Sequence, residues 1–301
     1  MSPPLHNALN GAALFPESGS QQDAQVREVA YYVEALTYGL EQLEKLPVSL
    51  RLLREIHRRL MKGVRGEKAY PGEFRRSQNW IGPPGCTLAE ARFVPPPVPE
   101  MHEALDALEK YLHEGDSYPP LVRLAFVHYQ FEAIHPFVDG NGRMGRLLVA
   151  LLLADWKMLS QPLLYLSAYF ERHRSTYYDL LLAVSEEGAW RDWVMFFLRG
   201  VLEQSREAGT KIKMLQDLHR SWHEALTASR APASAIRLLE YLFVQPVITI
   251  RSVERLLDVA YHTAKGAVER LAREGILFPM GNKHRNTVYL ARGVLEVISS
   301  R

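Results

Sequence analysis

The chain has 301 residues, of which 47% are hydrophobic and 23% are charged, and its formal net charge at pH 7 is +2. This composition excludes a disordered chain, and the length suggests two domains of roughly 150 residues. The longest apolar stretch, residues 147–154, is far shorter than the ~20 residues of a membrane-spanning helix. So mild a charge makes neither nucleic acid nor an acidic membrane the main partner.

The N-terminus and the cysteine content predict the compartment. Residues 1–6 lack the basic start and the apolar stretch of a secretory signal, so we expect the mature chain to begin near Met1. The single cysteine, Cys86, fits a reducing compartment better than an oxidising one. We therefore expect a cytoplasmic protein without membrane contact.

The first two parts of the chain are an N-terminal arm, residues 1–25, and a main domain, residues 26–230. The arm is small and polar. In the main domain, apolar residues recur every three or four positions, which is the helical period. Prolines and glycines interrupt this pattern over residues 63–99, which predicts a long loop with a short hairpin, and loops of this length are often functional. The predicted helices cover residues 26–46, 50–61, 101–112, 121–134, 143–156, 177–185 and 190–226.

The third part, residues 231–301, has a different pattern. It predicts three helices and then a hairpin with a Gly-Asn-Lys-His-Arg turn, which together describe a winged helix-turn-helix. The helices are expected at residues 236–243, 252–259 and 262–274, and the strands at 276–278 and 287–290. The predicted fold class of the whole chain is therefore all-α.

The segment 135–146, His-Pro-Phe-Val-Asp-Gly-Asn-Gly-Arg-Met-Gly-Arg, connects two predicted helices. Gly140 and Gly142 permit positive φ angles, so successive backbone amides can face a bound anion, and the next helix adds its positive dipole end. Asp-Gly and Asn-Gly pairs are also ordinary turn formers. Because the flanking segments are helical, the usual hairpin use is excluded, and we predict a phosphate site.

The charged side chains of this segment fit a phosphoanhydride ligand. Arg143 and Arg146 are three positions apart and reach one side of the helix start, where they can clamp phosphates. Asp139 can hold Mg2+, which takes one or two carboxylates plus phosphate oxygens. His135, with an ordinary pKa near 6.5, is available in its neutral form to accept a proton from an incoming hydroxyl.

The segment resembles the motif of the Fic (filamentation induced by cAMP) family, in which histidine, phenylalanine, an acid, Gly-Asn-Gly-Arg and a final arginine stand in this order. The likeness extends from residue 32 to about residue 201. It implies a Fic-type helical bundle with a short β-hairpin flap, and a protein adenylyltransferase that moves AMP from ATP to a Tyr, Thr or Ser hydroxyl of a target protein or of itself. Pyrophosphate is released, and Mg2+ is the cofactor. Further stretches that carry the likeness are residues 71–75, 78–82, 93–96, 128–131 and 164–167.

The resemblance also implies roles by position. His135 would be the general base, Asp139 the Mg2+ ligand and Phe137 a packing residue. A flap would pair with the extended backbone of the target, although a rigid covering loop is the alternative. Its docking residues would be Gln78, Asn79, Trp80, Ile81 and Phe93. The nucleotide-binding residues would be Gly140, Asn141, Gly142, Arg143, Met144, Gly145, Arg146 and Tyr177. Tyr178 stands beside Tyr177 in the stretch that resembles the adenine-contacting region, and a core role is equally open for either tyrosine.

One position departs from the family pattern. Relatives with an N-terminal Fic-associated region carry an inhibitory glutamate that pairs with the last arginine of the motif. Asn10 stands in that position here and has no charge to offer Arg146. We expect self-inhibition to be weak or absent, or to come from elsewhere, such as Glu17 or a partner chain.

Two alternatives stay open. His128, Glu132 and His135 share one helical face and can chelate zinc, although an apolar helix favours core roles. The second alternative is a DNA-binding regulator whose Fic domain is a sensor or uses another nucleotide, because residues 233–301 carry a net charge of +4. Winged helices also serve protein contact, which leaves a homodimer open. The expected DNA contacts are His262, Thr263, Lys265, Lys283 and Arg285.

Overall fold

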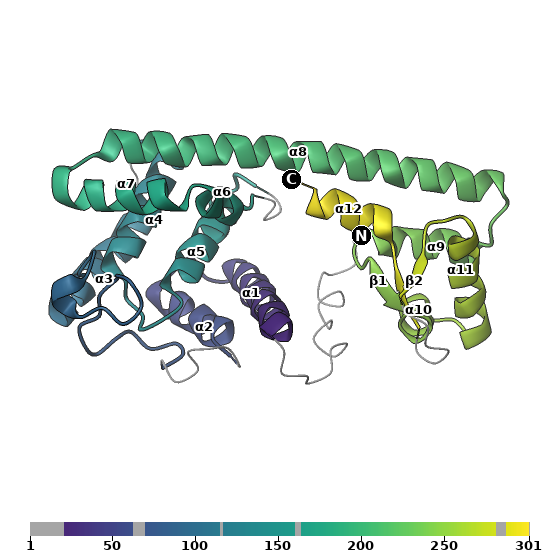
Figure 1. The fold of residues 1–301 in the computed structure, drawn as a ribbon, viewed down its shortest axis with the longest axis horizontal. Helices are drawn as coiled ribbons and strands as arrows, with labels where there is room; N and C mark the ends of the chain where they lie inside the picture. Colours follow the sequence, from purple (N-terminus) through teal and green to yellow (C-terminus); the bar gives the residue numbers. More distant parts are fainter. Residues whose placement is uncertain (1–20, 63–69, 115–116, 160–163, 281–286, 301) are drawn as a thin grey trace. The chain divides into compact units, whose positions relative to one another are not determined.

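The computed structural model describes residues 21–62, 70–114, 117–159, 164–280 and 287–300 (Figure 1). These residues form two compact units, which divide between Ser205 and Arg206. Helices make up most of both units, and the strands belong to one small sheet. Within the described ranges, no helix combines the length and the apolar character needed to cross a membrane. Most of the predicted N-terminal arm, including Asn10 and Glu17, lies outside the described residues.

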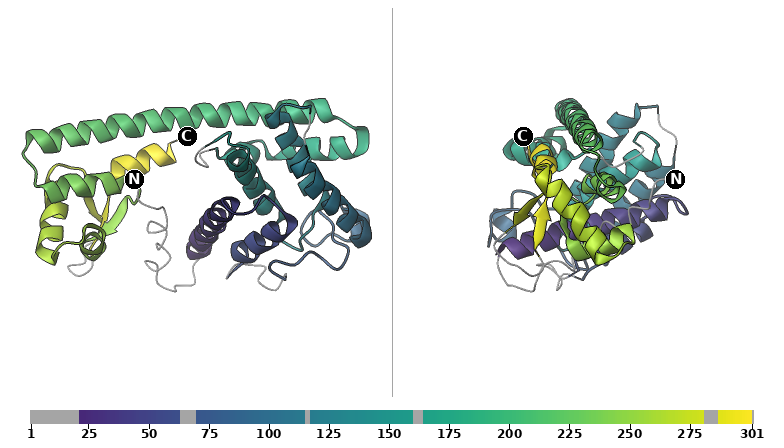
Figure 2. Two further views of the ribbon diagram at one scale, coloured as in Figure 1. Left: turned by 180° about the vertical axis from the view of Figure 1, so that it is seen from behind. Right: turned by 90° about the vertical axis from the view of Figure 1, so that its right-hand side faces the viewer.

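The first unit is built from the helices that the apolar periodicity predicts, and these predictions are confirmed. One short helix, α6, was not predicted, because seven residues carry too little periodicity. The long helix α8 is continuous over 39 residues and can be followed along its length in the left-hand view of Figure 2. The bounds are α1 Gln21–Leu43, α2 Leu50–Leu60, α3 Val98–His113, α4 Pro120–Ile134, α5 Asn141–Asp155, α6 Leu166–Arg172, α7 Arg174–Glu187 and α8 Trp190–Ala228.

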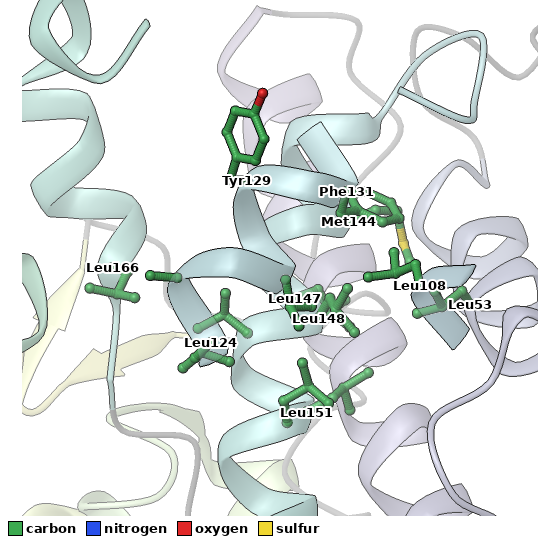
Figure 3. Close-up of a cluster of buried hydrophobic side chains, with 14 of the residues drawn as sticks. Leu53, Leu108, Leu124, Tyr129, Phe131, Met144, Leu147, Leu148, Leu151 and Leu166 are labelled. Atoms are coloured by element: carbon green, nitrogen blue, oxygen red, sulfur yellow. The ribbon is translucent and has the colours of Figure 1, made fainter. Parts of the chain in front are cut away.

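Helix α5 lies at the centre of this unit. It is buried on nearly all sides, because its leucine-rich middle packs against α1, α2 and α4. Figure 3 shows Met144, Leu147, Leu148 and Leu151 of α5 in the same cluster as Phe131 of α4. Burial of each such side chain contributes about 1.5–3 kcal/mol, so the packing fixes both helices and therefore the ends of the loop that joins them.

The flap, defined here as residues 78–95, is mostly irregular. A 3-10 turn, η3 (Leu88–Glu90), lies near its tip. The expected hairpin is reduced to one antiparallel bridge, in which the amides of Ile81 and Phe93 each donate to the other's carbonyl at 2.9 and 3.1 Å. Prolines explain the short ladder, because they lack the N–H that a strand must donate. The flanking prolines are Pro83, Pro84 and Pro95.

The second unit contains the three predicted helices and the predicted hairpin strands, in antiparallel order β1-β3-β2. Strand β1 and helix α12 were not predicted, because a three-residue strand and a helix of about two turns leave little pattern in a sequence. The predicted turn of the hairpin, with Lys283 and Arg285, lies outside the described residues. The bounds are α9 Ala233–Leu242, β1 Val247–Thr249, α10 Ile250–Leu257, α11 Tyr261–Arg273, β2 Phe278–Met280, β3 Val288–Leu290 and α12 Arg292–Ser299.

The last turns of α8 belong to the core of the second unit. Leu215, Leu218, Trp222 and Leu226 of this helix pack with the buried residues of α9 to α12. The predicted boundary at residues 230/231 follows the end of α8, whereas the compact units divide within it. Apolar residues at helical spacing indicate that a helix has a buried face, but they do not indicate which of two neighbouring cores buries it.

Candidate active site

The loop between α4 and α5 begins at His135 and ends at Gly140. His135 follows the last residue of α4 with φ 47°, in the left-handed region, which turns the chain out of the helix. Gly140 precedes α5 with φ 80°, also left-handed. The loop thus joins the two helices through a left-handed residue at each end, His135 and Gly140, and this conformation is unfavourable for most residues other than glycine.

Asn141 and Phe137 close this loop from inside. The Asn141 side-chain oxygen accepts from the Phe137 amide at 2.8 Å, and its amide nitrogen donates to the Phe137 carbonyl at 2.8 Å. Asn141 is 2% exposed and Phe137 is fully buried, as expected for a packing residue. Both polar atoms of the Asn141 side chain are thus bonded within the loop, and the same residue begins α5.

His57 of α2, for which the sequence predicted no role, contacts the loop at Phe137 and Asp139. Its ring stacks on Phe137 with 3.8 Å between centroids. The Gly72 amide donates to Nδ1 at 2.9 Å, so the proton is on Nε2, which donates to the Asp139 carbonyl at 3.0 Å. Burial lowers the pKa of His57 to about 4, which keeps the ring neutral and this pattern intact at pH 7.

Arg75 is the second support that the sequence analysis left without a role. Its guanidinium is 1% exposed and donates to backbone carbonyls of three segments. Nε donates to the His135 carbonyl at 3.0 Å, Nη1 to that of Ser77 at 3.3 Å, and Nη2 to that of Pro96. The Arg75 amide also donates to the Pro136 carbonyl at 2.8 Å. One side chain therefore ties the motif loop to both ends of the flap.

A cavity of about 320 Å³ lies over this loop. His135, Glu132 and Gly142 line it from α4 and the start of α5, and Tyr178 lines it from α7. The flap forms another wall, and an ion pair between Arg92 and Asp179 joins the flap to α7. The structure thus brings the predicted flap and the motif to one cavity. The flap residues that line it are Trp80, Ile81, Gly82, Arg92 and Phe93.

Two of the predicted flap residues hold the flap instead of lining the cavity. The Gln78 side chain donates to the Pro95 carbonyl at 2.8 Å. Asn79 Nδ2 lies 3.2 Å from the Phe137 carbonyl and 3.4 Å from the His135 carbonyl, to which it donates. Both side chains therefore position the base of the flap.

His135 is in the state that a proton acceptor requires. Its Nδ1 lies 3.3 Å from the Glu132 carbonyl, so Nδ1 carries the proton and Nε2 is free to accept one. Burial lowers the pKa of His135 to about 4, and the nearby Arg75 guanidinium acts in the same direction. The ring is therefore neutral at pH 7.

The charged residues of the motif have unused bonding capacity. Arg143 donates through Nη2 to the Met61 sulfur at 3.3 Å, while its buried Nη1 has no hydrogen-bond partner in the part of the chain that the structure describes. The Asp139 carboxylate is exposed, and one of its oxygens accepts from the Gly140 amide at 2.6 Å. Arg146 is partly buried beside Glu132 and Tyr32. Two guanidinium groups and one carboxylate thus surround the start of α5.

The structure places Tyr177 in the core. It is 5% exposed, and its hydroxyl pairs with His128 Nε2 at 3.0 Å. Its neighbour Tyr178 is 39% exposed and lines the cavity. His128 also pairs through Nδ1 with the Gly145 carbonyl at 3.3 Å, so neither of its nitrogens is free for zinc. Over the described ranges, no group of three or more His, Cys, Asp or Glu side chains is arranged to hold a metal ion.

The predicted DNA contacts that the structure describes lie at the start of α11. His262 and Lys265 are exposed, and Thr263 is half-buried. Lys265 lies 3.6 Å from the Glu269 carboxylate, with which it forms a surface ion pair.

Comparison with known proteins identifies the first unit's domain type. Residues 47–153 match the Fic/DOC family model. The chain is 32% identical over 158 residues to Protein adenylyltransferase Fic of Drosophila persimilis, and 34% identical over 151 residues to the protein of that name in Aedes aegypti. These matches cover 51% and 50% of this chain but 27% of each relative. The chain thus spans about a quarter of the length of these curated relatives.

A solved structure bears on the fold. The crystal structure of a Fic family protein from Desulfovibrio desulfuricans G20 superimposes with a TM-score of 0.54 and 20% identity, over 95% of this chain and 82% of that chain. Identity at this level shows the fold alone. The predicted all-α Fic-type bundle is confirmed.

We predict that Arg75→Met destabilises the protein by about 2–4 kcal/mol, because several buried carbonyls lose their donor. Arg76→Met is the matched control, since Arg76 is exposed and pairs only with Glu73 on the surface, and it should cost less than about 0.5 kcal/mol. Chemical denaturation measures both. Equal losses in the two variants would contradict the role given to Arg75.

We also predict that Gly140→Ala costs about 1–3 kcal/mol more than Gly85→Ala. Both glycines have φ near +80°, so both variants pay the same backbone penalty. Only at position 140 would the new Cβ meet the core, at 2.7 Å from the Met61 sulfur, whereas nothing lies within 4 Å of the Cβ at position 85. Thermal unfolding compares the stability of the two variants. Equal losses of stability would contradict the close contact between position 140 and Met61.

Proposed function

We propose that the chain is an Mg2+-dependent protein adenylyltransferase that uses ATP to modify a Tyr, Thr or Ser hydroxyl of a target protein or of itself. The observation that carries this proposal is the shared cavity, in which a neutral histidine, the start of α5 and the flap meet. The family domain and the printed names of the relatives support the same activity. Release of pyrophosphate completes the reaction.

The start of α5 would hold the phosphates. Backbone amides of residues 141 and 142 and the helix dipole favour an anion there. Arg143 brings an unpartnered buried N–H group, and Arg146 adds a second positive charge one turn later. A buried donor without a partner is costly, so a phosphate oxygen that accepts from Arg143 would stabilise the bound state.

His135 would move the proton. As the acceptor oxygen attacks the α-phosphorus, Nε2 takes the hydroxyl proton, and the bond to the leaving diphosphate breaks. The Glu132 carbonyl and Arg75 keep the ring in its tautomer and its position. The arginines stabilise the negative charge that develops on the leaving diphosphate.

Asp139 fits Mg2+. Its carboxylate is exposed at the edge of the loop, and the bond from the Gly140 amide fixes one oxygen and orients the other. Mg2+ commonly takes one carboxylate together with phosphate oxygens and water. Bound there, the ion would neutralise charge on the phosphates.

The flap would hold the target by pairing with its extended backbone. The single bridge between Ile81 and Phe93 leaves flap backbone without a strand partner, which is what strand addition uses. Trp80 is 42% exposed beside it and offers an apolar surface.

For the second unit, we propose a winged helix-turn-helix that contacts DNA. The order of helices and the antiparallel β2–β3 pair support this fold, and the exposed His262 and Lys265 at the start of α11 support the contact. Phosphate contacts release counterions, so affinity for duplex DNA should fall steeply between 50 and 200 mM salt. An electrophoretic shift that is absent at low salt would contradict the contact and leave protein binding as the role of this unit.

We predict that His135→Ala lowers AMP transfer by about 10²- to 10⁴-fold, because the acceptor loses its base. His262→Ala, in the second unit, should retain full transfer. Intact-mass measurement after incubation with ATP and Mg2+ follows the modification of the protein itself and of lysate proteins. Unchanged transfer by the His135 variant would overturn the mechanism.

We further predict that kcat at saturating ATP is flat from pH 8 down to about pH 5. The pKa of His135 is lowered to about 4, so the neutral base is lost only when the pH falls toward that value. A pH–rate profile, with circular dichroism to confirm folding at each pH, measures this. A fall centred near pH 6.5 would mean that the histidine is not buried as described.

A further inference from the structure

Glu132 is a half-buried acid of the cavity that the mechanism above does not use. It lies one turn before His135 on α4 and lines the cavity. Its Oε1 atom is buried and has no hydrogen-bond partner among the described residues. Polar atoms left in this state are uncommon in folded proteins and often await a ligand.

The carboxyl group lies directly against the start of α5. A Cβ built on Gly145 would be 2.3 Å from Glu132 Oε1, and one built on Gly142 would be 4.0 Å from it. A side chain at position 145 would therefore displace the acid, whereas the distance at position 142 is an ordinary van der Waals contact. The unpartnered oxygen is therefore held beside the first two turns of α5, where the phosphates are proposed to bind.

The surroundings of Glu132 disfavour its charged form. Burial raises the pKa of the carboxyl to about 7, although Arg146 of α5 acts in the opposite direction. From α7, the Tyr177 hydroxyl faces it, and a charged Glu132 in turn raises the pKa of that hydroxyl. His135 follows directly after the end of this helix and is neutral at pH 7. Near neutral pH the acid is thus divided between its two forms.

We propose that Glu132 belongs to the phosphate site: its protonated carboxyl donates a hydrogen bond to a phosphate oxygen of the nucleotide, and its ionised form repels that phosphate and competes for Arg146. This inference rests on the proposed function and adds to it a nucleotide-binding residue outside the motif. Because binding and protonation are linked, a nucleotide that prefers the protonated form must also raise the proton affinity of Glu132.

The proposal predicts a proton uptake that no other shifted group of the site supplies. The pKa values of His57 and His135 are about 4 and that of Tyr32 is about 12, so these groups do not titrate between pH 6 and pH 8.5. The fraction of Glu132 able to bind falls as the pH rises above about 7. Affinity for ATP should then fall about fivefold between pH 7 and pH 8.

Isothermal titration calorimetry of the full chain with ATP and Mg2+ tests this. Titrations at pH 6.5, 7.5 and 8.5, each in two buffers of different ionisation enthalpy, give both the affinity and the protons taken up. We expect uptake of a fraction of a proton at pH 7.5 in the starting protein and none in Glu132→Gln, which keeps the shape and a donor N–H but cannot ionise. The affinity of the Gln variant should vary less with pH. Glu103→Gln, at an exposed position of α3, should behave like the starting protein.

The outcomes separate this inference from the proposed function. At each pH, the protonation of ATP itself is the same for the starting protein, Glu132→Gln and Glu103→Gln, so it cancels when the three proteins are compared. ATP binding with equal pH dependence and equal proton uptake in the starting protein and in Glu132→Gln would overturn the role of Glu132 alone. No ATP binding at pH 6.5 by the starting protein would overturn both. Urea unfolding confirms that the Gln variant is folded, and its stability should exceed that of the starting protein above pH 7, where burying the ionised acid is costly.

Discussion

The bonds from the Arg75 guanidinium to backbone carbonyls hold the site together. Arginine keeps its charge when buried and offers five N–H groups in a fixed fork, so a single side chain can bond several carbonyls at once. Arg75 reaches His135 on the motif loop and Ser77 and Pro96 at the two ends of the flap. A lysine has three donors on one nitrogen and cannot span these positions. The geometry of both the loop and the flap therefore depends on one residue.

The other polar groups under the loop serve the same purpose. Neutral His57 bonds the Asp139 carbonyl, and Asn141 bonds both backbone groups of Phe137. These bonds fix the loop to side chains of α2 and α5 and to Arg75. Among the described residues, no hydrogen bond reaches His135 Nε2, Arg143 Nη1 or Glu132 Oε1. A preorganised anion site requires both a loop held rigid by its own hydrogen bonds and donor groups that are still available to a ligand.

The sequence predicted the elements and the motif because their signals are local. Helical periodicity within 10 to 20 residues located the long helices, and twelve consecutive residues carried the motif. The supports could not be found in this way, since Arg75 lies 60 residues from His135 and His57 lies 82 residues from Asp139. The available signals were an arginine in a stretch that resembles the family and a histidine on an apolar helical stripe. The choice between Tyr177 and Tyr178 likewise required knowing which side of α7 faces the core.

The central claim is that the start of α5 grips the phosphates of a nucleotide while His135 faces the reacting phosphorus. The most direct measurement is a crystal structure of the chain with a non-hydrolysable ATP analogue and Mg2+. We expect phosphate oxygens within hydrogen-bond distance of the amides of residues 141 and 142 and of the Arg143 side chain, with the α-phosphorus in the same cavity as His135 Nε2. A nucleotide bound elsewhere, or one whose phosphates point away from α5, would contradict the account.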